Sequence, residues 1–131
     1  MLNKMLLGTL VAFSFSAAAN IAVIVNPANN TSVDAEEVVR IYTGRSNAFV
    51  AVNLAESSAL RSDFDEKGVG RSSSQLKAHW SKLVFTGKGT PPAELASEAE
   101  VIEFVAANPK AIGYINADKA TAAVKIVHTI K

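Results

Sequence analysis

Cysteine is absent from the 131-residue sequence, and histidine and tryptophan are scarce, with two copies and one copy. Without cysteine the fold has no disulfide, and the chain cannot carry the lipid-modified cysteine of a bacterial lipoprotein. A zinc site would need carboxylates from elsewhere, so packed or surface positions are the expected roles of His79 and His128. No charge of one sign dominates, since 13 basic residues face 12 acidic ones. A nucleic-acid partner is therefore not expected.

The first nineteen residues have the pattern of a signal peptide. Lys4 gives a positive start, Met5 to Phe15 is almost wholly apolar, and Ala17 to Ala19 supplies small residues for a signal peptidase. The apolar run is shorter than the about 20 residues of a membrane-spanning helix, so an N-terminal membrane anchor is the less favoured alternative. We expect residues 1–19 to be removed, leaving residues 20–131 as one periplasmic domain that does not span the membrane.

The first half of that domain alternates strand and helix patterns. Residues 21–25 are a continuous apolar run, typical of a strand buried on both faces. A helix pattern follows, with Asp34 near its start and Gly44 at its end, and residues 49–52 predict a second buried strand. Residues 58–66 predict another helix. Strands separated by helices indicate an α/β fold, a single three-layer lobe with a mostly parallel sheet flanked by helices.

The longest predicted helix begins at Ser72. Ser72 and Gln75 have the spacing of a capping box, and Gly87 is placed to end the helix in a left-handed turn. One apolar stripe runs along this helix, and we expect it to face the sheet: Leu76, Trp80, Leu83 and Val84.

The C-terminal part repeats the pattern on a smaller scale. Ser97 and Glu100 again have capping-box spacing, and Asn108 with the following proline closes that helix. Residues 111–114 and 124–130 predict the last two strands.

No combination of side chains in the sequence predicts catalysis. No serine lies in a Gly-x-Ser-x-Gly elbow or has a base partner. Gly87-Lys88-Gly89-Thr90 looks like a fragment of a phosphate loop, but that pattern needs a glycine where Lys82 stands and a strand in place of the preceding helix. We therefore expect a protein that is not an enzyme and has no cofactor.

The candidate ligand-binding residues lie where the second strand ends. Asn53 belongs to that end, and Ser57 and Ser58 follow at the start of the next helix. Ligands of open α/β sheets sit outside the carboxyl ends of strands, and a helix start offers free N–H groups to an anion. Asn53, Ser57 and Ser58 are therefore the expected anion-binding residues. The alternative is that Ser57 only caps the helix.

Several segments together resemble a known family. They are Asn26-Pro27, the helix end Ile41-Tyr42-Thr43-Gly44, the serine-rich helix start, the segment from His79-Trp80 to Pro91-Pro92, and Ala111-Ile112-Gly113-Tyr114. This order is similar to the periplasmic phosphate-binding proteins of ABC transporters, which have the type 2 periplasmic-binding-protein fold, and to their short members. The resemblance implies a second lobe of that fold. It also implies a phosphate-like oxyanion as ligand and a role in phosphate uptake.

The family's second-lobe motif resembles Arg-x-Asp-x-Ser-Gly-Thr and falls on residues 53–59 of this chain. Asn53 and Ala55 stand where the family has its arginine and aspartate, so only the hydroxyl of Ser57 is retained, with Ser58 able to add another. Loss of the guanidinium implies weak binding. An ABC permease, another envelope protein and a second copy of the chain are the partners implied. The alternative function is an envelope interaction module that keeps the fold without the ligand.

The N-terminal pattern predicts export with cleavage between Ala19 and Asn20. Mass spectrometry of the protein from a periplasmic extract should show a chain that begins at Asn20. A chain that keeps Met1 and fractionates with the membrane would contradict this prediction.

Overall fold

Strand β1 (Ile21–Val25) is the buried centre of the fold, and all five of its residues are buried.

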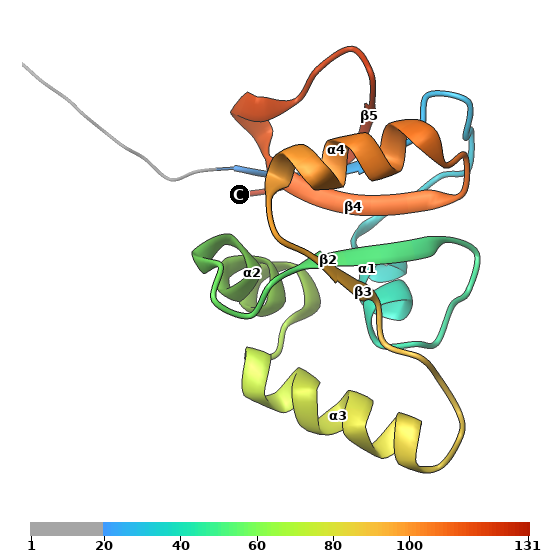
Figure 1. Cartoon of the computed structure of the whole chain (residues 1–131), viewed down its shortest axis with the longest axis vertical. Coiled ribbons are helices and arrows are strands. Elements are labelled where there is room, and N and C mark those ends of the chain that lie inside the picture. Colours follow the sequence, from blue (N-terminus) through green and yellow to red (C-terminus); the bar gives the residue numbers. More distant parts are fainter. Residues whose placement is uncertain (1–19) are drawn as a thin grey trace, which may run out of the picture.

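The computed structural model describes residues 20–131, so the predicted signal peptide lies outside the described residues. Figure 1 shows the order of the elements along the chain. They are β1, α1 (Ala35–Tyr42), β2 (Val50–Leu54), α2 (Ala59–Asp63), the π-helical turn η1 (Phe64–Val69), α3 (Ser73–Phe85), β3 (Ala93–Leu95), α4 (Glu98–Ala107), β4 (Ala111–Asn116), the 3₁₀ turn η2 (Ala117–Lys119) and β5 (Lys125–Ile130).

The five strands form one sheet in the order β3-β2-β4-β1-β5. β2 runs parallel to β3 and β4, whereas β1 is antiparallel to β4 and β5. Four strands therefore share one direction and β1 opposes them, so the expected mostly parallel sheet is confirmed with one reversed strand. In the register of the sheet, Val23 on β1 pairs with Tyr114 on β4 and with His128 on β5.

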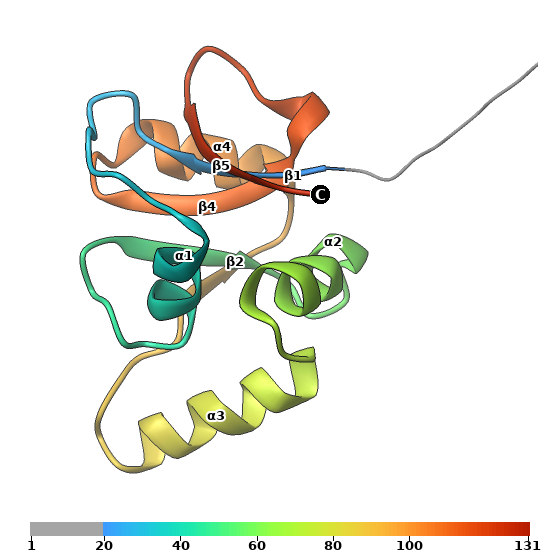
Figure 2. The same ribbon diagram turned by 180° about the vertical axis from the view of Figure 1, so that it is seen from behind.

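Helices cover both faces of the sheet, which gives the expected three-layer lobe. α4 lies over one face, and α1, α2 and η1 lie over the other (Figures 1 and 2). α4 buries Val101 and Val105, one turn apart, and α1 buries Val38, Ile41 and Tyr42 at helical spacing. β3 was not expected from the sequence, because it has only three residues and follows two prolines.

β2 separates from β4 after two paired positions, Val50 with Ala111 and Ala51 with Ile112. Two buried tyrosines then bond to the backbone groups of β2 that β4 no longer reaches. The Tyr42 hydroxyl donates to the carbonyl of Val52 at 2.8 Å, and the Tyr114 hydroxyl accepts from the N–H of Leu54 at 3.1 Å. This arrangement satisfies groups that would be costly to bury unpaired.

Phe64 joins these tyrosines in an aromatic cluster between the sheet and the helices on one face. Its ring stacks on Tyr114 with centroids 3.8 Å apart, and Tyr42 meets it edge-on at 4.8 Å. Phe64 belongs to η1, so the cluster attaches the π-helical turn directly to β4. Aromatic pairs of this kind stabilise a fold beyond their buried area, by about 0.5–1.5 kcal/mol.

Helix α3 lies below the β3 edge and is less buried than its stripe predicts (Figure 1). Only Leu76 is buried. Trp80 and Leu83 are half-buried, and Val84 is 51% exposed. The expectation that the whole stripe faces the sheet is therefore wrong, because α3 stands beside the edge of the sheet and not over its face.

The predicted helix ends are largely confirmed. Ser72 and Gln75 form both hydrogen bonds of the capping box, and Gly87 has a left-handed φ of 71°. At α4, Ser97 Oγ accepts from the N–H of Glu100 at 3.2 Å, but the Glu100 carboxylate accepts from the N–H of Ala96. The second capping box is therefore only half formed.

Gly113 on β4 has no room for a side chain. A Cβ there would lie 2.6 Å from Val101 of α4 and 3.1 Å from Val52 of β2. Gly113→Ala should therefore lower the free energy of unfolding by about 1–3 kcal/mol, the usual cost of overpacking a core. Urea unfolding followed by circular dichroism measures the change.

Gly68→Ala is the matched control, because the nearest atom to an added Cβ is the flexible end of Ile130, at 2.8 Å. A smaller loss is expected there. An equal or larger loss for Gly68→Ala would show that the contact with Val101 does not decide the cost.

Candidate functional site

The candidate site lies at the carboxyl end of β2, where a short turn leads into α2. Ser58 is the N-cap of α2, and its Oγ accepts the N–H of Arg61 at 3.4 Å. Ser57 is exposed and Ser58 is half-buried. The capping role considered for Ser57 therefore belongs to Ser58.

The structure does not bring the three predicted residues into one pocket. Asn53 is only 7% exposed, its Oδ1 accepts the hydroxyl of Tyr114, and its side chain lines a cavity between α3 and the β3 edge. Ser58 lines a different cavity, of about 580 Å³, at the start of α4. Ser57 and Ser58 are adjacent in the chain, but Asn53 points to the other side of the turn.

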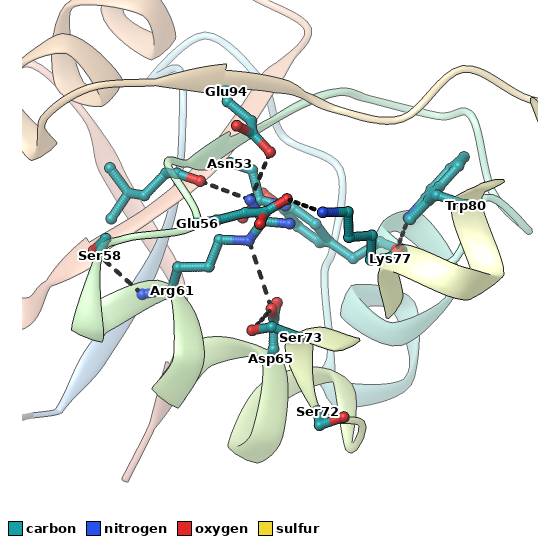
Figure 3. A network of polar contacts seen from close by, with 12 residues as sticks. Asn53, Glu56, Ser58, Arg61, Asp65, Ser72, Ser73, Lys77, Trp80 and Glu94 are labelled. Carbon is teal, nitrogen blue, oxygen red and sulfur yellow. Dashed lines mark hydrogen bonds and ion pairs between the residues drawn. The ribbon is translucent and has the colours of Figure 1, made fainter. Parts of the chain in front are cut away.

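Sequence reasoning missed Arg61, which is the central charge of this region. The side chain is buried, at 8% exposure, and its Nη1 donates to the carbonyl of Leu54 at 3.0 Å and to Glu94 at 2.7 Å. Figure 3 shows the guanidinium between Glu94 of β3 and Asp65 of η1, with Nε 3.5 Å from the Asp65 carboxylate. The i,i+4 spacing of Arg61 and Asp65 was the one available signal in the sequence.

The charge of Arg61 is therefore already balanced by protein groups. Burial lowers the pKa of Arg61, but the bond to Glu94 and the charge of Asp65 outweigh it and raise the pKa overall. Glu56 and Lys77 form a further, exposed ion pair at 3.6 Å nearby. An anion arriving at the end of β2 meets no free guanidinium of the kind that binds phosphate in a bidentate manner.

The start of α4 is also occupied by a carboxylate of the protein itself. Glu98, the first residue of α4, accepts the N–H of Asn116 at 2.7 Å and lies 3.9 Å from the Lys119 ammonium. A helix start favours negative charge, and Glu98 supplies it. The cavity beside Ser58 therefore offers a ligand only part of the positive potential of α4.

Both histidines have structural surroundings. His79 Nε2 lies 2.8 Å from the carbonyl of Thr43, which can only accept, so this nitrogen carries the proton. His128 is half-buried on β5. Within residues 20–131 no group of three His, Cys, Asp or Glu side chains could hold a metal ion, and no helix is long and apolar enough to cross a membrane.

No protein-family model and no curated protein matches this chain. Solved structures do match, among them the following three. An ABC-type phosphate transport receptor from Vibrio cholerae matches with a TM-score of 0.65 and 20% identity over 83% of this chain and 46% of that one. A Clostridium perfringens protein assigned as a phosphate ABC transporter substrate-binding protein, with bound phosphate, matches with a TM-score of 0.67 and 22% identity. The match covers 83% of this chain and 45% of that one. PstS from Borrelia burgdorferi matches with a TM-score of 0.62 and 18% identity, and the match covers 84% of this chain and 47% of that one.

These similarities confirm the fold that the sequence resemblance implied. The chain has the fold of one lobe of a periplasmic binding protein, and it spans less than half the length of these three structures. At this level of identity the likeness establishes the fold alone.

Asp65 gives a pH test of the buried charge cluster. Its carboxylate is 1% exposed, and burial raises its pKa above the ordinary 3.8, despite the hydrogen bond from Ser73 at 2.6 Å. A raised pKa contributes stability that is present below the unfolded-state pKa and lost as pH rises through the folded-state pKa. The free energy of unfolding would be measured for the wild type and for Asp65→Asn, and the second value subtracted from the first. This difference should fall as the pH rises from 3, by at most about 1.4 kcal/mol per pH unit.

Urea melts at closely spaced pH values between about 3 and 7 would measure this difference. Above the folded-state pKa of Asp65 the difference should become constant. A difference that stays flat, or that grows with pH, would contradict the burial of an unfavourable charge at Asp65.

Proposed function

We propose that this protein is an exported, non-enzymatic binding protein that takes phosphate or a similar oxyanion weakly at the β2–α2 turn, in a role linked to phosphate uptake. The observation that carries the proposal is the fold, shared with three phosphate-transport proteins, with the β2–α2 turn at the carboxyl end of a sheet strand. Ser57 and Ser58 supply hydroxyl groups there.

The contacts at the turn support weak affinity. Hydroxyl and N–H donors contribute about 0.5–1.5 kcal/mol each, so three or four of them give about 4 kcal/mol, which is millimolar binding. Arg61 is held by Glu94 and Asp65, and the exposed Glu56 carboxylate lies next to Ser57 in the chain. Solvent at an exposed site further weakens each charge interaction.

A partner that encloses the anion would strengthen this binding. The chain corresponds to one lobe and covers 45–47% of the length of the matched structures. We therefore propose that a second polypeptide, either an ABC permease, another envelope protein or a second copy of this chain, completes the site by adding donors and excluding water.

Isothermal titration with phosphate tests the site, with Ser57→Ala/Ser58→Ala and Glu56→Gln as variants. The wild type should bind with a dissociation constant of about 1 mM, and the double alanine variant should bind several-fold more weakly. Glu56→Gln removes a repelling carboxylate and frees Lys77, so it should bind several-fold more tightly at low salt.

Light scattering at the same phosphate concentrations tests the partner proposal for a second copy. Submicromolar binding by a strict monomer would contradict the need for a partner. Equal binding by wild type and the double alanine variant would remove Ser57 and Ser58 from the site.

A further inference from the structure

A cavity of about 390 Å³ lies between α3 and the edge of the sheet, apart from the serines at the start of α2. One wall is apolar and comes from α3 and the segment before β3: Leu76, Trp80, Val84, Phe85, Pro91 and Pro92. The other end is polar and contains Asn53, Arg61 and Glu94, with Glu56 and Lys77 nearby (Figure 3). An apolar cavity with a few convergent polar groups is the usual form of a small-ligand site.

The apolar wall is held rigidly although it is partly exposed. The Trp80 indole N–H donates to the carbonyl of Tyr42 at 3.1 Å. The ring packs against Gly44 and Gly89, where an added Cβ would lie 2.8 Å and 3.2 Å from it. Val84 is 51% and Phe85 92% exposed, so the protein itself leaves this wall open.

Asn53 presents unused hydrogen-bond donors to the cavity. The Tyr114 oxygen already accepts the N–H of Leu54, so its hydrogen goes to Oδ1 of Asn53 and fixes the orientation of the amide. Asn53 is buried, at 7% exposure, and residues 20–131 provide no acceptor for its Nδ2. Within residues 20–131 Arg61 Nε is the only buried side-chain nitrogen or oxygen without a hydrogen-bond partner, so Nδ2 of Asn53 is open to solvent in the cavity, where a carbonyl oxygen of a ligand would replace water as its acceptor.

The edge strand β3 offers one further peptide group. Leu95 faces β2, since its carbonyl accepts the N–H of Ala55 at 3.1 Å. Alternate residues of a strand turn their N–H and C=O to opposite sides, so those of Glu94 point away from β2. Pro92 has no N–H, which limits pairing along this edge to about one residue.

The charges around the cavity indicate a ligand without net charge. Arg61 is paired with Glu94 at 2.7 Å and lies near Asp65, and Lys77 is paired with Glu56 at 3.6 Å. Two cations and two carboxylates line the cavity and sum to no net charge, which disfavours a phosphate dianion but suits a zwitterion. We propose that this groove is a second binding site, which takes a short zwitterionic peptide with a bulky apolar side chain against Trp80 and its peptide group at Asn53 and Glu94.

Trp80 is the only tryptophan, so its fluorescence reports directly on the groove. The probe is the tripeptide Gly-Phe-Gly, with Gly-Gly-Gly as the matched peptide that lacks the apolar group. Gly-Phe-Gly should change the Trp80 emission saturably at concentrations up to about 10 mM, and Gly-Gly-Gly should not. Isothermal titration gives the affinity independently.

Val84→Asp places a charge on the exposed apolar wall and should weaken Gly-Phe-Gly binding about tenfold or more, with an unchanged melting temperature. Lys82→Asp is the control on the same helix outside the groove, and it should bind as the wild type does. Asn53→Asp keeps the acceptor for Tyr114 but removes the Nδ2 donors, so it should also lose binding. Ser57→Ala/Ser58→Ala should bind the peptide normally, which separates this site from the proposed anion site.

Three results would overturn the proposal. The first is the absence of any saturable response to Gly-Phe-Gly, and the second is equal binding of Gly-Gly-Gly. The third is a Trp80 emission shift that depends on protein concentration alone and is abolished by Val84→Asp, because the groove would then be covered by a second copy of the chain.

Discussion

The separation of β2 from β4 is the constraint on which the candidate site of this protein depends. Beyond Ala51 the two strands no longer pair, and three backbone groups of β2 find side chains in place of a neighbouring strand. Tyr42 bonds to Val52, Tyr114 to Leu54 and Arg61 to the carbonyl of Leu54. In a low-dielectric interior the bonds of such a network strengthen one another, although Arg61 Nε is buried without a hydrogen bond and has only its ion pair with Asp65 at 3.5 Å.

The same network is one reason for the proposal that this lobe by itself binds phosphate only weakly. The one buried guanidinium near the end of β2 holds a backbone carbonyl and two carboxylates, and it is therefore a structural group. Asn53 stands where the resembling family has an arginine, and the hydroxyl of Tyr114 fixes its amide. The Ser57 and Ser58 hydroxyls and the Asn53 amide are neutral groups, in keeping with the proposals of weak oxyanion binding at the turn and of a peptide group in the groove.

Local structure was predictable where a few neighbouring residues decide it. The caps of Ser72 and Ser97, the left-handed Gly87 and the buried strand at residues 21–25 follow from short-range rules and are confirmed. β3 was missed because its pairing with β2 is decided by tertiary contacts and not by its own three residues. The stripe on α3 predicted an apolar face correctly but could not show that the sheet ends before it covers that face.

The candidate site was predictable only in part for the same reason. Strand and helix order placed Asn53, Ser57 and Ser58 near a strand end, but the direction of each side chain depends on distant residues. Tyr114 is 61 positions from Asn53, and Glu94 is 33 positions from Arg61. Such partners leave no spacing signal in a single sequence.

A double-mutant cycle between Tyr114 and Asn53 tests the account most directly. Tyr114→Phe, Asn53→Ala and the double variant would be compared with wild type by urea unfolding. If the Tyr114 hydroxyl bridges the opened backbone of β2 and orients Asn53, the two substitutions should couple by about 1 kcal/mol or more, because either one breaks the shared bond. Effects that add to within about 0.3 kcal/mol would show that the two side chains act independently, and would contradict the account.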